Sequence, residues 1–281
     1  MYNVWVSSKK KIDGISLNSS DDELCREYLS SGYVIREAAD LDALDWILQN
    51  TAEVAAGVLG VAKPMRATET QAFFNTIHER VTPPDLNDFR LKVLHGLNAL
   101  SDFWQMYYRI AKPYLEAIVG NELAMQQRPN LSIQMPNDSS SLLPVHSDIW
   151  SGDSPYEVVV WLPLVDCFGT KAMYILPAPT SDKFVLTLKD GAHQSSDSIY
   201  AAISENVEWL EIKCGQVLLF DQSALHGNIV NTEKETRWSM NCRFKGLFTP
   251  YGDKKLGEFF VPLIMKPASS RGLGYKLPEL E

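Results

Sequence analysis

The sequence has few cysteines and no excess of positive charge. Its 281 residues include four cysteines, which are scattered and form no CxxC pair. This usage excludes a disulfide scaffold, and we expect free thiols, as is usual in a reducing compartment. The formal net charge is −9, so no basic field is available to replace the counterions of a nucleic acid. We therefore expect no nucleic-acid partner.

Long apolar runs are also missing. No stretch of the sequence approaches the length that a membrane-spanning helix needs. Residues 1–6 are followed by three lysines, which is not the basic-then-apolar order of a secretory signal. We therefore expect a cytoplasmic protein. Hydrophobic residues make up 45% and charged residues 22% of the chain, which is typical of a globular protein with ample core material.

The first 122 residues predict a mainly helical support. Apolar residues recur there at spacings of three and four, and a Ser/Asp cluster opens the first helix. Gly32 is the expected end of that helix, because glycine adopts the left-handed conformation without steric cost. Helices are predicted over residues 19–29, 41–59 and 86–119, and a short strand over residues 33–35. Helices of this kind usually pack on a sheet.

From residue 131 onward the pattern changes to short runs of β-branched and aromatic residues between turn signals. Strands are predicted over residues 131–135, 158–164, 172–176, 184–188, 208–212, 217–220 and 237–244. Seven or eight such strands suit a jelly roll. We therefore predict a single α+β domain over residues 1–281, with a helical support (1–122), a jelly-roll core (123–250) and a C-terminal extension (251–281).

Two short motifs in the β-rich half suggest a metal site. His146 and Asp148 are two residues apart, so on an extended strand their side chains point to the same face. His226 follows 80 positions after His146. Two imidazoles and one carboxylate form the facial triad that suits non-haem Fe(II) and leaves coordination positions open.

The residues after His226 give this motif its family context. His226 is followed by Gly227, by Asn231 five residues on and by Arg237 eleven residues on. Together with the His-x-Asp pair, this resembles the 2-oxoglutarate-dependent Fe(II) oxygenases of the phytanoyl-CoA hydroxylase type, over residues 131–248. Within that superfamily the chain looks most like oxygenases of bacterial carbohydrate and lipopolysaccharide assembly, with the Kdo hydroxylases as the nearest match.

The resemblance implies a fold, a cofactor set and a reaction. It implies a double-stranded β-helix, cupin-like, with catalytic Fe(II) held by His146, Asp148 and His226. Arg237 would bind the far carboxylate of the co-substrate 2-oxoglutarate; O2 is the oxidant, and ascorbate is a further candidate cofactor. Because halogenating relatives lack the carboxylate ligand, Asp148 favours hydroxylation. The implied substrate is a saccharide, free or lipid-linked, with Kdo of lipopolysaccharide as the candidate.

Other function classes stay open at this stage. A cupin-like metal-dependent isomerase or a sugar-binding barrel without oxygenase activity would also suit the fold. Arg237 discriminates between them, because those proteins need no anchor for 2-oxoglutarate. The sequence leaves the oligomeric state open.

Three further polar residues have roles that the sequence does not fix. Period two places Arg237, Ser239, Asn241 and Arg243 on one face of a strand. Arg243 is therefore a candidate for binding an acidic substrate, or else a salt-bridge residue. Lys171 precedes a predicted strand, and His193 lies in a polar loop.

Residues 252–266 join a small basic cluster to an apolar run too short to span a bilayer. Lys254 and Lys255 could meet anionic head groups while Phe259 and Phe260 touch the interface. This stretch predicts peripheral contact with the inner membrane. The alternative is that it covers the barrel as ordinary core.

Overall fold

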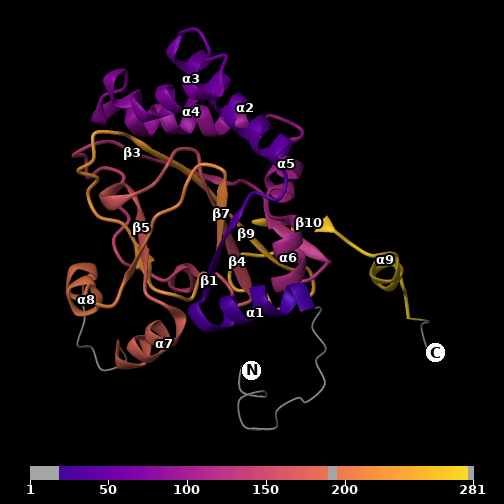
Figure 1. Ribbon diagram of the computed structural model, residues 1–281. Helices are drawn as coiled ribbons and strands as arrows, with labels where there is room; N and C mark the ends of the chain where they lie inside the picture. Colours follow the sequence, from indigo (N-terminus) through magenta and orange to yellow (C-terminus); the bar gives the residue numbers. More distant parts are fainter. Residues whose placement is uncertain (1–18, 189–194, 278–281) are drawn as a thin grey trace.

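The computed structural model describes residues 19–188 and 195–277, and within them a large antiparallel sheet organises the protein (Figure 1). Its strand order is β1-β7-β4-β9-β2-β10, and β3 also pairs with β9. The strands are β1 (Tyr33–Glu37), β2 (Leu123–Gln126), β3 (Asn130–Gln134), β4 (Glu157–Pro163), β7 (Gln216–Asp221), β9 (Arg237–Gly246) and β10 (Phe260–Ile264). Strands from both ends of the described chain therefore flank the central β-rich segment.

A smaller sheet faces the large one. It has the order β6-β5-β8, with β5 (Met173–Ile175), β6 (Glu208–Leu210) and β8 (His226–Gly227). Val159 and Trp161 of β4 pack against Met173 and Ile175 of β5 in one buried cluster. The two sheets therefore enclose a core between them, as in a jelly roll.

Helices cover the opposite face of the large sheet. Val158, Val160 and Leu162 alternate with the residues that face the small sheet, and they join the helical core. The covering helices are α2 (Leu41–Leu59), α3 (Ala67–Asn75), α4 (Leu86–Asn98), α5 (Phe103–Arg109) and α6 (Lys112–Ile118), with α1 (Ser19–Ser31) at the lower edge in Figure 1. Since β4 is buried on both faces, it reads as a continuous apolar run in the sequence.

Local signals in the sequence set the ends of the helices. The Asp40 carboxylate accepts a hydrogen bond from the Ala43 backbone N–H, and Gly60 ends α2 in the left-handed conformation at φ 68°. Gly32 follows α1 at φ 81°, as predicted. The predicted helix over residues 86–119 is divided into α4, α5 and α6. Pro113 lies in the first turn of α6, where its missing N–H costs no hydrogen bond.

The predicted strand over residues 184–188 is wrong. These residues lie in and just after α7 (Ala178–Thr187), which precedes α8 (Ser196–Ile203). Pro177 and Pro179 stand at the start of α7, where proline is favoured. Phe184, Val185 and Leu188 pack at helical spacing against the α8 side chains. Their β-propensity was outweighed by the helix start and by tertiary packing.

The stretch over residues 252–266 contributes to the sheet. β10 pairs with β2, and the Phe260 side chain is 0% exposed. Lys254 forms an ion pair with Asp153, with Nζ and Oδ2 2.5 Å apart. Phe260 therefore belongs to the core and cannot contact a membrane in this fold. α9 (Pro267–Leu273) follows, apart from the sheet (Figure 1). Peripheral membrane contact by the other residues stays a prediction.

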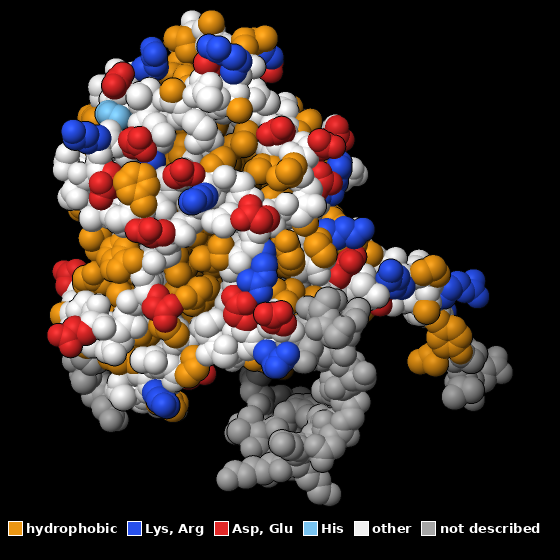
Figure 2. Space-filling model, viewed as in Figure 1, with side chains coloured by type: hydrophobic (Ala, Val, Ile, Leu, Met, Phe, Trp, Pro, Cys, Tyr) orange, Lys and Arg blue, Asp and Glu red, His pale blue; other side chains and the backbone are white. Residues whose placement is uncertain are grey.

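Two surface findings bear on partners. No helix within residues 19–188 and 195–277 is long and apolar enough to cross a membrane. On the face drawn in Figure 2, acidic and basic side chains are intermixed over the helices and the sheets. That face therefore presents no field of one sign.

Candidate metal centre

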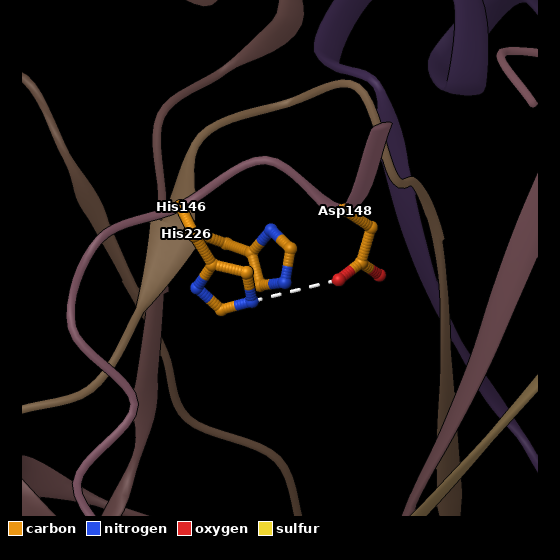
Figure 3. Close-up of side chains that lie close together, drawn as sticks. All are labelled: His146, Asp148 and His226. Atoms are coloured by element: carbon orange, nitrogen blue, oxygen red, sulfur yellow. Dashed lines mark ion pairs between the residues drawn. The ribbon is translucent and has the colours of Figure 1, made fainter. Parts of the chain in front are cut away.

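A backbone bridge brings the two distant histidines together. His146 and His226 are partners in an antiparallel β-bridge, and each backbone N–H donates to the carbonyl oxygen of the other at 3.0 Å. Residues directly opposite in such a pair place their side chains on the same face. The two imidazole centroids are 4.4 Å apart. Figure 3 shows the two rings beside each other, with Asp148 opposite them. These two backbone hydrogen bonds therefore bring together histidines that are far apart in the sequence.

Asp148 lies close to the two histidines because the backbone turns after Ser147. The prediction that it shares one extended strand with His146 is wrong: Ser147 is extended, but Asp148 begins the 3-10 helix η3 (Asp148–Ser151). The Asp148 backbone N–H donates to the Gln222 carbonyl at 3.0 Å, and the Ser147 hydroxyl donates to the same carbonyl. These bonds anchor the turn and direct the carboxylate toward the histidines (Figure 3).

The three side chains suit a metal ion. One ligand atom from each of His146, Asp148 and His226 lies within 4.8 Å of the others. The His146 Nε2 and Asp148 Oδ1 atoms are 3.5 Å apart. Each imidazole Nδ1 lies near the carbonyl oxygen two residues earlier, at 2.8 Å from Pro144 O and 2.9 Å from Ala224 O. A carbonyl can only accept, so each Nδ1 donates and each Nε2 is left to bind a metal.

Gly227 is required by the close packing behind His226. A Cβ atom at this position would lie 2.6 Å from the Tyr174 hydroxyl and 2.9 Å from the Leu143 carbonyl oxygen. The next residue, Asn228, holds the same loop, because its side-chain oxygen accepts from the Leu143 backbone N–H at 2.9 Å. The His-Gly motif therefore reflects a loop that closes over the second histidine.

The electrostatics leave two of the three ligands, His226 and Asp148, in the protonation states that a metal needs. Burial, and secondarily the neighbouring His146, lowers the pKa of His226 to about 4. Burial acts to raise the pKa of Asp148, but the hydrogen bond with His146 and the charges of His226 and Arg243 outweigh it and hold that pKa well below its usual range. At neutral pH the His226 ring is therefore neutral and Asp148 is ionised, as metal ligation demands.

We expect the metal-free protein to lose stability as the pH falls from about 6.5 to about 4. In this window the unfolded chain protonates His226, whereas the folded chain keeps the ring neutral because its pKa is lowered to about 4. The linked loss is at most about 3 kcal/mol. The pKa of His146 is raised, against burial, by its hydrogen bond with Asp148, which acts in the opposite direction. Urea unfolding at pH 7 and pH 5 should show a larger loss for wild type than for His226→Asn, and an equal loss would contradict this assignment.

Arg243 is bound to the carboxylate ligand. Its guanidinium lies 2.8 Å from Asp148 Oδ2 and 3.3 Å from Asp153 Oδ1. It also donates to the side-chain oxygens of Gln222 and Gln126, at 3.1 and 3.3 Å. Arg243 is only 8% exposed. It therefore fixes the orientation of Asp148 from behind, and its predicted role toward an acidic substrate stays a prediction.

Arg237 is a buried cation without a carboxylate partner in the described part of the chain. It is 2% exposed, and its hydrogen bonds are long: 3.4 Å to the Ala172 carbonyl and 3.5 Å to the Ser132 hydroxyl. Its Nε atom is buried without any hydrogen-bond partner. Burial lowers the pKa of Arg237. A buried charge left in this state is unfavourable by several kcal/mol, and an anion bound from outside would compensate it.

Two neighbours of Arg237 also have buried polar atoms without a hydrogen-bond partner. Gln134 lies opposite Arg237 in the β3–β9 ladder, and Ser239 follows two residues later on the same face. The Gln134 Oε1 and Ser239 Oγ atoms are both buried without a partner. Period-two spacing placed Ser239 on the correct face without a role. No pattern in the sequence indicated Gln134, because its place opposite Arg237 depends on the strand register.

The three candidate metal ligands and Arg237 line one pocket. It is bounded by His146, Asp148, His226, Arg237, Ser239 and Asn241, with apolar walls from Trp161, Met173 and Phe220. This is the arrangement that the sequence motif predicts, since a metal and an anionic ligand could be bound side by side.

The fold of this chain is similar to that of several solved structures. No family model and no curated protein matches the sequence. Among solved structures, the non-heme monooxygenase ThoJ in its apo form is 16% identical, with a TM-score of 0.56, over 86% of this chain and 84% of that one. EctD from S. alaskensis, solved with 2-oxoglutarate and 5-hydroxyectoine, is 15% identical, with a TM-score of 0.53, over 88% and 82%.

A third solved structure is also similar to this chain. HygX from Streptomyces hygroscopicus, solved with nickel and 2-oxoglutarate bound, is 10% identical, with a TM-score of 0.50, over 86% of this chain and 91% of that one. The chain has the fold of the non-heme oxygenases. The predicted jelly roll with its helical support is thereby confirmed.

The remaining polar residues of the sequence motif have structural partners in this oxygenase-like fold. Asn231 donates to the carbonyls of Gln134 and Glu235, so it fastens the loop before β9. Lys171 is fully buried, and its Nζ lies 2.8 Å from a Glu235 carboxylate oxygen. His193 lies outside the described residues.

Proposed function

We propose that the protein is an Fe(II)- and 2-oxoglutarate-dependent dioxygenase that hydroxylates its substrate. The observation that carries this proposal is the buried, unpaired Arg237 in the same pocket as His146, Asp148 and His226. The three ligands would occupy one face of the metal, which leaves positions for a bidentate 2-oxo acid and for O2. Bound iron with O2 would supply the oxidising power for cleavage of an unactivated C–H bond.

The protein's own residues have separable parts in this reaction. Arg237, with the Ser239 hydroxyl beside it, would bind the far carboxylate of 2-oxoglutarate through charge-assisted hydrogen bonds. Arg243 holds the Asp148 carboxylate in place. Trp161, Met173 and Phe220 form apolar walls that exclude water from the reacting atoms.

The alternatives explain less of the pocket. A cupin-like isomerase or a sugar-binding barrel has no need for an unpaired arginine beside the metal ligands, and leaving one buried would destabilise it. The carboxylate ligand Asp148 is present and anchored. By analogy with halogenating relatives, which lack that carboxylate, its presence favours hydroxylation.

We further propose that the substrate is a saccharide, with Kdo, free or lipid-linked, as the candidate. The support is a hollow beside the metal pocket in which three asparagine amides and three serine hydroxyls stand among apolar side chains. A lipid-linked sugar would require peripheral contact with a membrane, for which exposed Lys255 and half-buried Phe259 are accessible. Release of succinate from 2-oxoglutarate with Fe(II), measured with and without Kdo, tests the reaction and the substrate together.

We expect Arg237→Lys to weaken 2-oxoglutarate binding by about 10- to 150-fold while metal binding is nearly unchanged. Lysine keeps the charge but loses the planar fork of donors, and loss of a charge-assisted hydrogen bond costs roughly 1.5–3 kcal/mol. Anaerobic titration of the Fe(II)-loaded protein with 2-oxoglutarate, followed by absorbance, measures it. The exposed Arg271→Lys in α9 is the matched control. Unchanged 2-oxoglutarate affinity, with a strong effect of Arg243→Lys instead, would exchange the two assignments.

A further inference from the structure

A second hollow lies beside the metal pocket. Its volume is about 570 Å³, against about 60 Å³ for the pocket at the metal ligands. The two share Ser132, Leu143 and Asn241 as lining residues, so they are adjacent at that point. The inner pocket has room for about four to six water molecules, which suits a small acid. The outer hollow has the size of a site for a larger organic ligand.

A polar stripe connects the two spaces. In the β3–β9 ladder the directly opposed pairs on the pocket face are Gln134 with Arg237, Ser132 with Ser239, and Asn130 with Asn241. Opposed residues lie on the same side of a sheet. The stripe therefore runs from the buried anion site to the outer hollow, where the Asn130 amide donates to the Asn241 side-chain oxygen at 2.8 Å.

Arg90 of α4 forms the far wall of the outer hollow. It is half-buried, and it donates to the Leu131 carbonyl at 3.2 Å and to the Asn87 side-chain oxygen at 2.8 Å. The bond to Leu131 ties α4 to β3, which lie side by side (Figure 1). These two bonds fix the guanidinium and leave other donors available.

Arg90 differs from several other arginines of the protein because it has no ion pair among the described residues. Arg36, Arg66 and Arg109 each form an ion pair with a carboxylate. Arg90 has none within the described residues, and no described acidic residue lines the outer hollow. The hollow thus combines apolar walls with amide and hydroxyl groups, and it holds one fixed cation without a carboxylate partner among the described residues, which favours an oxyanion.

We propose that the outer hollow is the substrate site and that Arg90 binds an oxyanion, carboxylate or phosphate, on a hydroxyl-rich substrate. The amides of Asn87, Asn130 and Asn241 and the hydroxyl of Ser132 would meet the substrate's hydroxyl groups. The end opposite the anion would enter the metal pocket past Ser132 and Leu143. This inference rests on the proposed function and adds to it the charge and orientation of the substrate.

Titration calorimetry with defined sugars tests the proposal. The protein is loaded with Co(II) and 2-oxoglutarate, which prevents turnover, and titrated with glucuronate, Kdo, glucose 1-phosphate and uncharged glucose. We expect the charged sugars to bind about tenfold or more tightly than glucose. Arg90→Gln should weaken their binding by about 10- to 150-fold and leave glucose and 2-oxoglutarate unaffected. The ranking of glucuronate and Kdo against glucose 1-phosphate distinguishes a carboxylate from a phosphate site.

Two further variants separate binding from structure. Arg90→Lys keeps the charge and should restore part of the preference for charged sugars, whereas a purely structural loss would not be rescued in this selective way. Arg271→Gln removes one exposed arginine from α9 and should leave all four affinities unchanged. The proposal is overturned if the charged sugars bind no better than glucose, or if Arg90→Gln keeps their preference.

The same titrations distinguish failure of this proposal from failure of the proposed function. If 2-oxoglutarate binds to the Co(II) protein but no sugar depends on Arg90, the substrate assignment fails and the oxygenase assignment stands. If 2-oxoglutarate does not bind while the charged sugars still depend on Arg90, the oxygenase assignment fails and the anion site stands.

Discussion

Replacing His146, Asp148 or His226 by alanine is expected to abolish Fe(II)-dependent release of succinate from 2-oxoglutarate. The three ligand atoms lie within 4.8 Å of one another, and with only three protein ligands the loss of any one removes a third of the coordination that the protein supplies. Circular dichroism should show a largely intact fold, although Asp148→Ala should unfold at a lower temperature because Arg243 loses a buried partner. The backbone bonds that join His146 to His226 do not depend on the imidazoles.

A matched control is His95→Ala. His95 is exposed on α4 and is not among the residues that line the metal pocket, so its loss should leave turnover at the wild-type rate. Binding of Co(II) gives a readout independent of activity, since each ligand variant should lose the affinity for the metal that wild type has. Wild-type turnover in an alanine variant at any of the three positions would remove that residue from the metal centre.

Arg243→Met is expected to lower both the stability of the metal-free protein and its affinity for metal. Methionine fills similar space but leaves the carboxylates of Asp148 and Asp153, which now pair with Arg243 at 2.8 and 3.3 Å, without that cation. Removing one partner of a buried ion pair typically costs about 3–5 kcal/mol. Loss of a group that orients a metal ligand typically weakens metal binding by about 10- to 100-fold.

Urea unfolding and Co(II) titration of the same samples separate the two effects. Arg36→Met is the control, because Arg36 pairs with Glu27 in a partly exposed position remote from the ligands, so both effects should be small. Arg243→Lys should recover part of the metal affinity by restoring the charge. If Arg243→Met binds Co(II) as wild type does and binds charged sugars more weakly, Arg243 belongs to the substrate site and not to the support of Asp148.

Much of the fold could be predicted from the pattern of apolar and polar residues in the sequence. Period-two and helical spacing predicted the helix over residues 41–59, the strand after Gly32 and most strands of the jelly roll, because these depend on which side of each element faces a core. It failed at residues 184–188, where a proline-marked helix start competes with β-propensity. It also missed β2 and β10, which pair with each other near the edge of the large sheet.

The sequence by itself determined the chemistry of the metal centre: two imidazoles, one carboxylate and an arginine at a fixed spacing. Only the tertiary structure decided how these groups work, because hydrogen-bond partners and charge pairs depend on strand register. The β3–β9 register leaves Arg237 and Gln134 buried with unsatisfied polar atoms, while Arg243, on the same face of the same strand, is paired with Asp148. Two arginines that are equivalent by spacing thus differ in their surroundings, because one lies beside carboxylates of the protein and the other lines a pocket without a carboxylate partner among the described residues.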